Sequence, residues 1–116
     1  MCNKIQILNR TKNGILLYCN FNDIYHLLYN NLNFNFTAYE FESFCKYLND
    51  TNVEFWENEY RHSLYHKRIP IPTIQANLLI LIDQEEVKEL KHLVLSKENA
   101  YPLLKVKDID HKIFMN

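Results

Sequence analysis

Glycine and proline are scarce in this sequence. Gly14 is the only glycine, and the 116 residues include three prolines. A chain with one glycine in a turn cannot build the Gly-rich loop that binds nucleotide phosphates. The composition is 47% hydrophobic and 14% aromatic, which argues against global disorder. We therefore expect one folded domain, because a chain of this length can bury a single hydrophobic core.

An excess of charge of either sign is also missing. The chain has 13 Lys and Arg against 14 Asp and Glu, for a formal net charge of −1. The basic residues are scattered among acidic ones, so the sequence predicts no surface for nucleic acid. No apolar run reaches the roughly 20 residues that span a bilayer, and no secretory apolar segment follows Met1. We expect a cytoplasmic protein that binds neither nucleic acid nor membranes.

The three cysteines are odd in number and lack the spacing of a disulfide scaffold. This agrees better with a reducing compartment than with secretion. Cys45 falls on the apolar face of an expected helix, where we interpret it as a small buried hydrophobic residue. No Ser or Cys has the sequence context of a nucleophile elbow, and no pair of carboxylates stands out from the capping and surface acids. We expect that the protein is not an enzyme.

What the sequence does contain is an internal repeat, in residues 31–48 and again in residues 77–94. Each copy has Asn-Leu, an apolar strand-like run, a capping residue and a Glu three positions later. Thr37 and Asp83 can each accept a hydrogen bond from a first-turn N–H group while the Glu reaches back, as in a capping box. The repeat predicts a strand followed by a helix in each copy, with helices over residues 38–49 and 84–96.

The remaining segments complete an α+β fold. The Asn-Gly pair at residues 13–14 is typical of a hairpin turn with positive φ. We predict an N-terminal β-hairpin followed by two ββα units, with an antiparallel sheet and two helices packed on one of its faces. The predicted parts of this single domain, residues 1–116, are the hairpin (1–20), the first ββα unit (24–49), a connecting segment (50–66), the second ββα unit (67–97) and a C-terminal arm (98–116).

The connecting segment has an ambiguous pattern. Val53, Trp56 and Tyr60 would line one face of a helix, whereas Val53 and Phe55 would share one face of a strand. We favour a short ordered segment that packs through Phe55 and Trp56.

An interface is predicted in the second ββα unit. Pro70 and Pro72 remove N–H donors from one side of a strand, which predicts an edge strand. Residues 78–82 contain no polar residue, so this strand should be covered on both faces. Helices on one face would leave Leu79 and Leu81 bare on the second face of the central sheet. The hairpin or the C-terminal arm could cover them, and so could a second copy or a protein partner, with Trp56 as a further contact.

Two sets of residues are candidate zinc ligands. The first hairpin could bring Cys2, Cys19 and His26 together, although a fourth ligand is missing. His62 and His66 are spaced i, i+4 and would share a face if this segment were helical. A zinc-binding or ligand-binding domain that uses Cys19 and His26 is therefore the alternative function, while the preferred interpretation requires no cofactor.

Several short motifs follow one another in a distinctive order. They are Tyr18-Cys19, His-Leu-Leu-Tyr-Asn-Asn at 26–31, Phe55-Trp56, Arg-Ile-Pro-Ile-Pro-Thr at 68–73 and Asn77-Leu78. Over residues 1–95 the chain resembles a family of short cytoplasmic Bacteroidetes proteins of unknown function. That resemblance implies a Cys-x-x-Cys pair starting at Cys19, and Asn22 breaks the pair here. We predict a non-catalytic module for protein binding or homo-oligomeric assembly.

Overall fold

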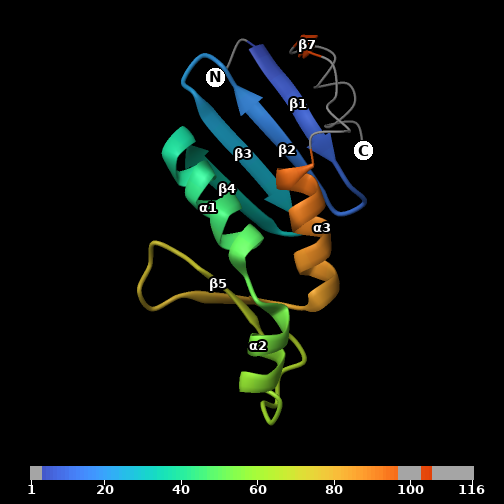
Figure 1. The fold of residues 1–116 in the computed structure, drawn as a ribbon. Helices are drawn as coiled ribbons and strands as arrows, with labels where there is room; N and C mark the ends of the chain where they lie inside the picture. Colours follow the sequence, from blue (N-terminus) through green and yellow to red (C-terminus); the bar gives the residue numbers. More distant parts are fainter. Residues whose placement is uncertain (1–3, 97–102, 106–116) are drawn as a thin grey trace.

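An antiparallel sheet formed by the first part of the chain is the base of the fold (Figure 1). The structure is a computed structural model that describes residues 4–96 and 103–105. The sheet has the strand order β4-β3-β2-β1-β7, and α1 and α3 lie side by side on one of its faces. The predicted α+β class, with four consecutive strands before the first helix, is confirmed. The elements are β1 (Lys4–Arg10), β2 (Gly14–Cys19), β3 (Ile24–Tyr29), β4 (Leu32–Thr37), α1 (Ala38–Asp50), α2 (Val53–Glu59), β5 (Ile69–Pro72), β6 (Leu79–Ile82), α3 (Gln84–Leu95) and β7 (Leu103–Lys105).

The two long helices begin where the capping residues predict. The Thr37 side chain accepts a hydrogen bond from the N–H of Glu40, and the Glu40 carboxylate accepts one from the N–H of Thr37. Asp83 and Glu86 form the same reciprocal pair at the start of α3. Both capping boxes are therefore present, and each fixes the point where a strand becomes a helix.

The turn between β1 and β2 corrects the prediction for Gly14. This glycine does not have a positive φ, which occurs instead at Asp23 (55°) and Asn30 (53°) in the next two turns. A Cβ on Gly14 would lie 2.8 Å from Cδ2 of Leu93 and 2.9 Å from the carbonyl oxygen of Leu28. The glycine is therefore required by the close approach of α3 to the hairpin, and not by the turn conformation.

A buried carboxamide joins α3 to the hairpin at the C-terminal end of the helix. The Nδ2 of Asn9 donates to the carbonyl oxygens of His92 (2.9 Å) and Leu93 (3.3 Å), and its Oδ1 accepts from the N–H of Arg10 (2.8 Å). Asn9 follows an irregularity in the pairing of β1 with β2, which turns its side chain toward α3. The His92 carbonyl also accepts the N–H of Ser96, so Asn9 adds side-chain hydrogen bonds to the capped end of α3.

A carboxylate joins α3 to the same hairpin at its turn. Glu89 accepts hydrogen bonds from the hydroxyls of Thr11 (2.6 Å) and Tyr29 (3.2 Å) and from the N–H (2.9 Å) and side chain (2.8 Å) of Asn13. Burial alone would raise the pKa of Glu89, but these hydrogen bonds outweigh it and lower the pKa below its usual value. Glu89 is therefore held as a charged structural anchor.

The connecting segment contains a short helix, α2. The side chain of Asn52 accepts a hydrogen bond from the N–H of Phe55 (3.0 Å) and caps the helix. Val53 and Trp56 pack against the main core, while Phe55 is half exposed. The prediction of a short ordered segment is confirmed for Trp56, whereas Phe55 contributes less to the packing than expected.

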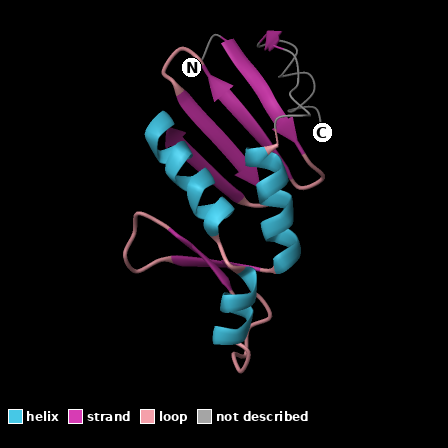
Figure 2. Ribbon diagram, viewed as in Figure 1, coloured by secondary structure: helices cyan, strands magenta, loops and turns pink. Residues whose placement is uncertain are grey.

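The strands β5 and β6 do not extend the main sheet but form a separate two-stranded sheet, the β5–β6 arm (Figure 2). β5 pairs only with β6 among the described strands, so its predicted edge position is confirmed. Ile69, Ile71 and Ile82 are buried in the main core. Leu79 and Leu81 are the cross-strand neighbours of Pro72 and Pro70, so their predicted place on the central sheet is wrong.

Candidate functional site

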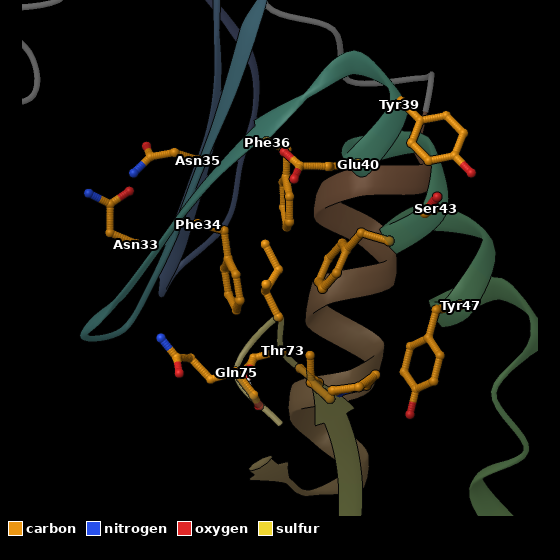
Figure 3. Close-up of a pocket in the computed structure, with 14 residues that line it drawn as sticks. Asn33, Phe34, Asn35, Phe36, Tyr39, Glu40, Ser43, Tyr47, Thr73 and Gln75 are labelled. Atoms are coloured by element: carbon orange, nitrogen blue, oxygen red, sulfur yellow. Dashed lines mark hydrogen bonds between the residues drawn. The ribbon is translucent and has the colours of Figure 1, made fainter. Parts of the chain in front are cut away.

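A groove of about 520 Å³ opens between β4, α1 and the end of the β5–β6 arm (Figure 3). Its walls are mainly aromatic and aliphatic, with a minority of polar side chains. The lining residues are Asn33, Phe34, Asn35, Phe36, Tyr39, Glu40, Ser43, Phe44, Tyr47, Ile71, Pro72, Thr73, Ile74 and Gln75.

The floor of the groove is an aromatic cluster that follows from the alternating sequence of β4. Phe34 and Phe36 point to the helix side of the sheet, while Asn33 and Asn35 point to the other side (Figure 3). The two Phe rings are stacked at 5.4 Å, and Phe44 from α1 lies 5.5 Å and 5.0 Å from them. Phe34 and Phe36 remain partly exposed because α1 covers only part of them.

One side of the groove is the outer edge of β4, where none of the described strands pairs. A two-residue turn separates β3 from β4, so Tyr29 and Leu32 must be a mutually hydrogen-bonded pair. Hydrogen bonding to β3 then alternates along β4, and the N–H and C=O groups of Asn33 and Asn35 point outward. The N–H of Thr37 also points outward but is bonded to Glu40.

The opposite side of the groove is the turn of the β5–β6 arm. The hydroxyl of Thr73 donates to the carbonyl oxygens of Gln75 (3.0 Å) and Leu78 (2.9 Å), which gives the turn a defined shape. The hydroxyl of Tyr47 donates to the carbonyl oxygen of Pro70 and joins the arm to α1. Ile74 at the tip of the arm is 93% exposed. The arm therefore presents an aliphatic side chain beside the open edge.

The groove has few polar groups available for chemistry. Among the described residues that line it, only Glu40 is charged, and its carboxylate already accepts the N–H of Thr37. The Tyr47 hydroxyl is occupied by Pro70. What the arrangement offers is apolar surface next to unpaired backbone donors and acceptors, which are the features that bind an extended polypeptide.

The whole chain, residues 1–116, matches the model of a family of unknown function, DUF6686. The chain belongs to this family. The match confirms the part of the resemblance that places the chain in a family of unknown function. A search of curated proteins and a search of solved structures each found no match for this DUF6686 chain.

The zinc candidates of this DUF6686 chain are not brought together as a ligand set. Cys19 is buried and disulfide-bonded, which differs from the expected free thiol, and Cys2 lies outside the described residues. The Nδ1 of His26 lies 2.6 Å from the Oδ1 of Asn35. α2 ends at Glu59, so exposed His62 and His66 do not share a helix face. Within residues 4–96 and 103–105, no group of three potential ligands could hold a metal ion.

Four of the five predicted interface residues belong to the β5–β6 arm, and the fifth, Trp56, lies in α2. Pro72 lines the groove and is exposed, whereas Pro70 is buried. Leu79 is half exposed, Leu81 is half-buried, and Trp56 packs on the core beside Tyr60. The groove brings only Pro72 of this set together with the β4 edge.

Sequence reasoning missed the aromatic floor and Ile74 as parts of one site. Alternation in β4 identifies Phe34 and Phe36 as inward residues but not as residues of an edge strand.

No helix in the described part of the chain is long and apolar enough to cross a membrane.

Proposed function

We propose that this protein is a non-catalytic protein-association module that holds a polypeptide in the groove beside β4. One observation carries the proposal: the outer edge of the six-residue strand β4 pairs with no other described strand and lies next to an apolar groove. Exposed apolar surface beside unpaired strand groups favours β-strand addition, in which backbone bonds give affinity and side-chain pockets give specificity.

The contrast between β4 and β5, which are both edge strands, supports this proposal. Proteins usually protect an edge strand with proline, lysine or a bulge, because an open edge recruits other strands. β5 carries Pro70 and Pro72. β4 contains neither proline nor a charged residue, and its pairing with β3 is regular over Leu32–Thr37. β6 (Leu79–Ile82) also lacks proline and charge, and among these strands β4 is the unprotected edge that lines the groove.

The state of the polar groups supports a non-catalytic role. Glu40 and Tyr47 serve the cap of α1 and the attachment of the arm. Burial, together with the charge of Glu42, raises the pKa of the Cys45 thiol to about 11. The thiol is therefore protonated at neutral pH and is a poor nucleophile.

Site-specific photo-crosslinking tests the proposal. A photoreactive amino acid replaces Tyr39, which lines the groove and is 79% exposed, or Tyr65, which is 67% exposed and lies outside the groove. We expect a covalent protein adduct from position 39 in cells, formed either with a second copy or with another protein, and none from position 65. Equal adduct yields from the two positions, or no adduct from position 39, would contradict the proposal.

A further inference from the structure

We infer that the occupant of the groove is a second copy of this chain, and that two copies pair their β4 strands antiparallel across a two-fold axis. This inference rests on the proposed function and names its partner. In an isologous dimer the same surface of both copies forms the interface, so the groove and the β4 edge must be complementary to themselves under a two-fold rotation. The backbone, the aromatic floor and the ends of the groove each satisfy it.

The backbone supplies the first match. The free N–H and C=O groups of the β4 edge belong to Asn33 and Asn35, since Glu40 occupies the N–H of Thr37. With the axis at Phe34, Asn33 of each copy lies opposite Asn35 of the other. Residues that face each other in such a pair exchange both of their backbone hydrogen bonds. This register therefore pairs every free donor and acceptor at the two residues.

The aromatic floor supplies the second match. In the same register, Phe34 lies opposite Phe34 of the second copy in a non-hydrogen-bonded pair, where side chains approach most closely. Both rings point to the helix side of the sheet, into the groove (Figure 3). The half-exposed pair of Phe34 and Phe36 in each copy would thus be covered by its counterpart.

The ends of the groove supply the third match. Tyr39 lies at the end of the groove where β4 runs into α1, and the arm residues Thr73 and Gln75 lie at the other end (Figure 3). A two-fold axis between antiparallel β4 strands places the Tyr39 end of one groove opposite the arm end of the other. Exposed Ile74 of each copy therefore approaches exposed Tyr39 of the other. Among the described lining residues only Glu40 is charged, and the two-fold places Glu40 of the two copies at opposite ends of the groove, so the two carboxylates do not face each other.

A proline substitution isolates the backbone contribution. Asn35→Pro removes an N–H that points away from β3, and an edge strand tolerates proline at such a position. Asn35→Thr is the matched control, because it also loses the contact of Asn35 with His26 but keeps the N–H. We expect a dimer for the wild type and Asn35→Thr by size exclusion with light scattering, and a monomer with an unchanged circular dichroism spectrum for Asn35→Pro.

A surface substitution keeps the inference testable if Asn35→Pro does not fold. Ile74→Lys changes a side chain that is 93% exposed, and Leu64→Lys changes one that is 97% exposed outside the groove. We expect the dissociation constant of the dimer to rise at least tenfold for Ile74→Lys and to stay unchanged for Leu64→Lys.

The outcomes separate the inference from the proposed function. A wild type that is monomeric at high concentration overturns the second-copy inference, and so does a dimer that persists in both Asn35→Pro and Ile74→Lys. Adducts from position 39 with a different protein would then leave the proposed function standing. Absence of any adduct from position 39 would remove the proposed function itself.

Discussion

Gly14 leaves no room for a side chain between the backbone of β3 at Leu28 and the side chain of Leu93 on α3. The Leu28 carbonyl oxygen would be 2.9 Å from an added Cβ, and a backbone atom cannot move aside as a side-chain tip can. We expect Gly14→Ala to lower the free energy of unfolding by about 1–3 kcal/mol, the usual cost of overpacking a close contact. Urea denaturation measures this, with Lys12→Ala at an exposed position of the same turn as the control. A loss no larger than that of the control would show that the approach is not tight.

Glu89 makes the stability of the hairpin contact depend on pH. Its folded-state pKa is lowered, so its contribution is complete above the unfolded value of 4.5 and is lost as the pH falls through the folded pKa. We expect Glu89→Gln to cost about 1–3 kcal/mol at neutral pH, since the hydrogen bonds go to a charged group. The difference from the wild type should shrink as the pH falls below 4.5 and through the lowered pKa of folded Glu89.

The control for Glu89 is Glu85→Gln, because the Glu85 side chain is largely exposed on the same helix. Thermal unfolding of the three proteins between neutral and acidic pH measures the effect. A Glu89→Gln difference that stays constant over this range would mean that the charge of Glu89 is not responsible.

At the scale of the element, the two capping boxes should contribute equally to α1 and α3. Thr37→Ala and Asp83→Ala each remove an acceptor for a first-turn N–H group. We expect each to cost about 1 kcal/mol in a denaturant titration, and Thr37→Ser and Asp83→Asn to stay near the wild type because they keep the acceptor. Alanine variants as stable as their capped counterparts would contradict this.

The helices and the first strands could be predicted because their signals are local. The Glu residues that follow Thr37 and Asp83 define both helix starts within one turn of sequence. α2 was ambiguous because Val53 belongs to a helical pattern and to a strand pattern alike. The Asn52 cap and the packing of Trp56 on the core stabilise the helical conformation of this segment. The packing of Trp56 depends on the tertiary structure, so the local sequence could not predict it.

At the scale of the whole molecule, the arrangement of the strands could not be predicted. The sequence predicted that Leu79 lies on the face away from the helices, but not that β6 leaves the main sheet. The groove exists because the arm stands apart and β4 ends the sheet. Both facts depend on which strands pair across long separations in sequence. The alternation of β4 is the same whether the strand is central or at an edge.

The central claim is that β4 is the strand through which this protein associates. Residue-resolved hydrogen–deuterium exchange of the backbone amides tests it most directly, at low and at high protein concentration. The amides of Phe34 and Phe36 point to β3, and that of Thr37 is bonded to Glu40, so all three should be protected at both concentrations. We expect the amides of Asn33 and Asn35 to exchange rapidly when dilute and slowly when concentrated, because they are bonded only in the dimer. Rapid exchange of Asn33 and Asn35 at every concentration, beside protected Phe34 and Phe36, would contradict the claim.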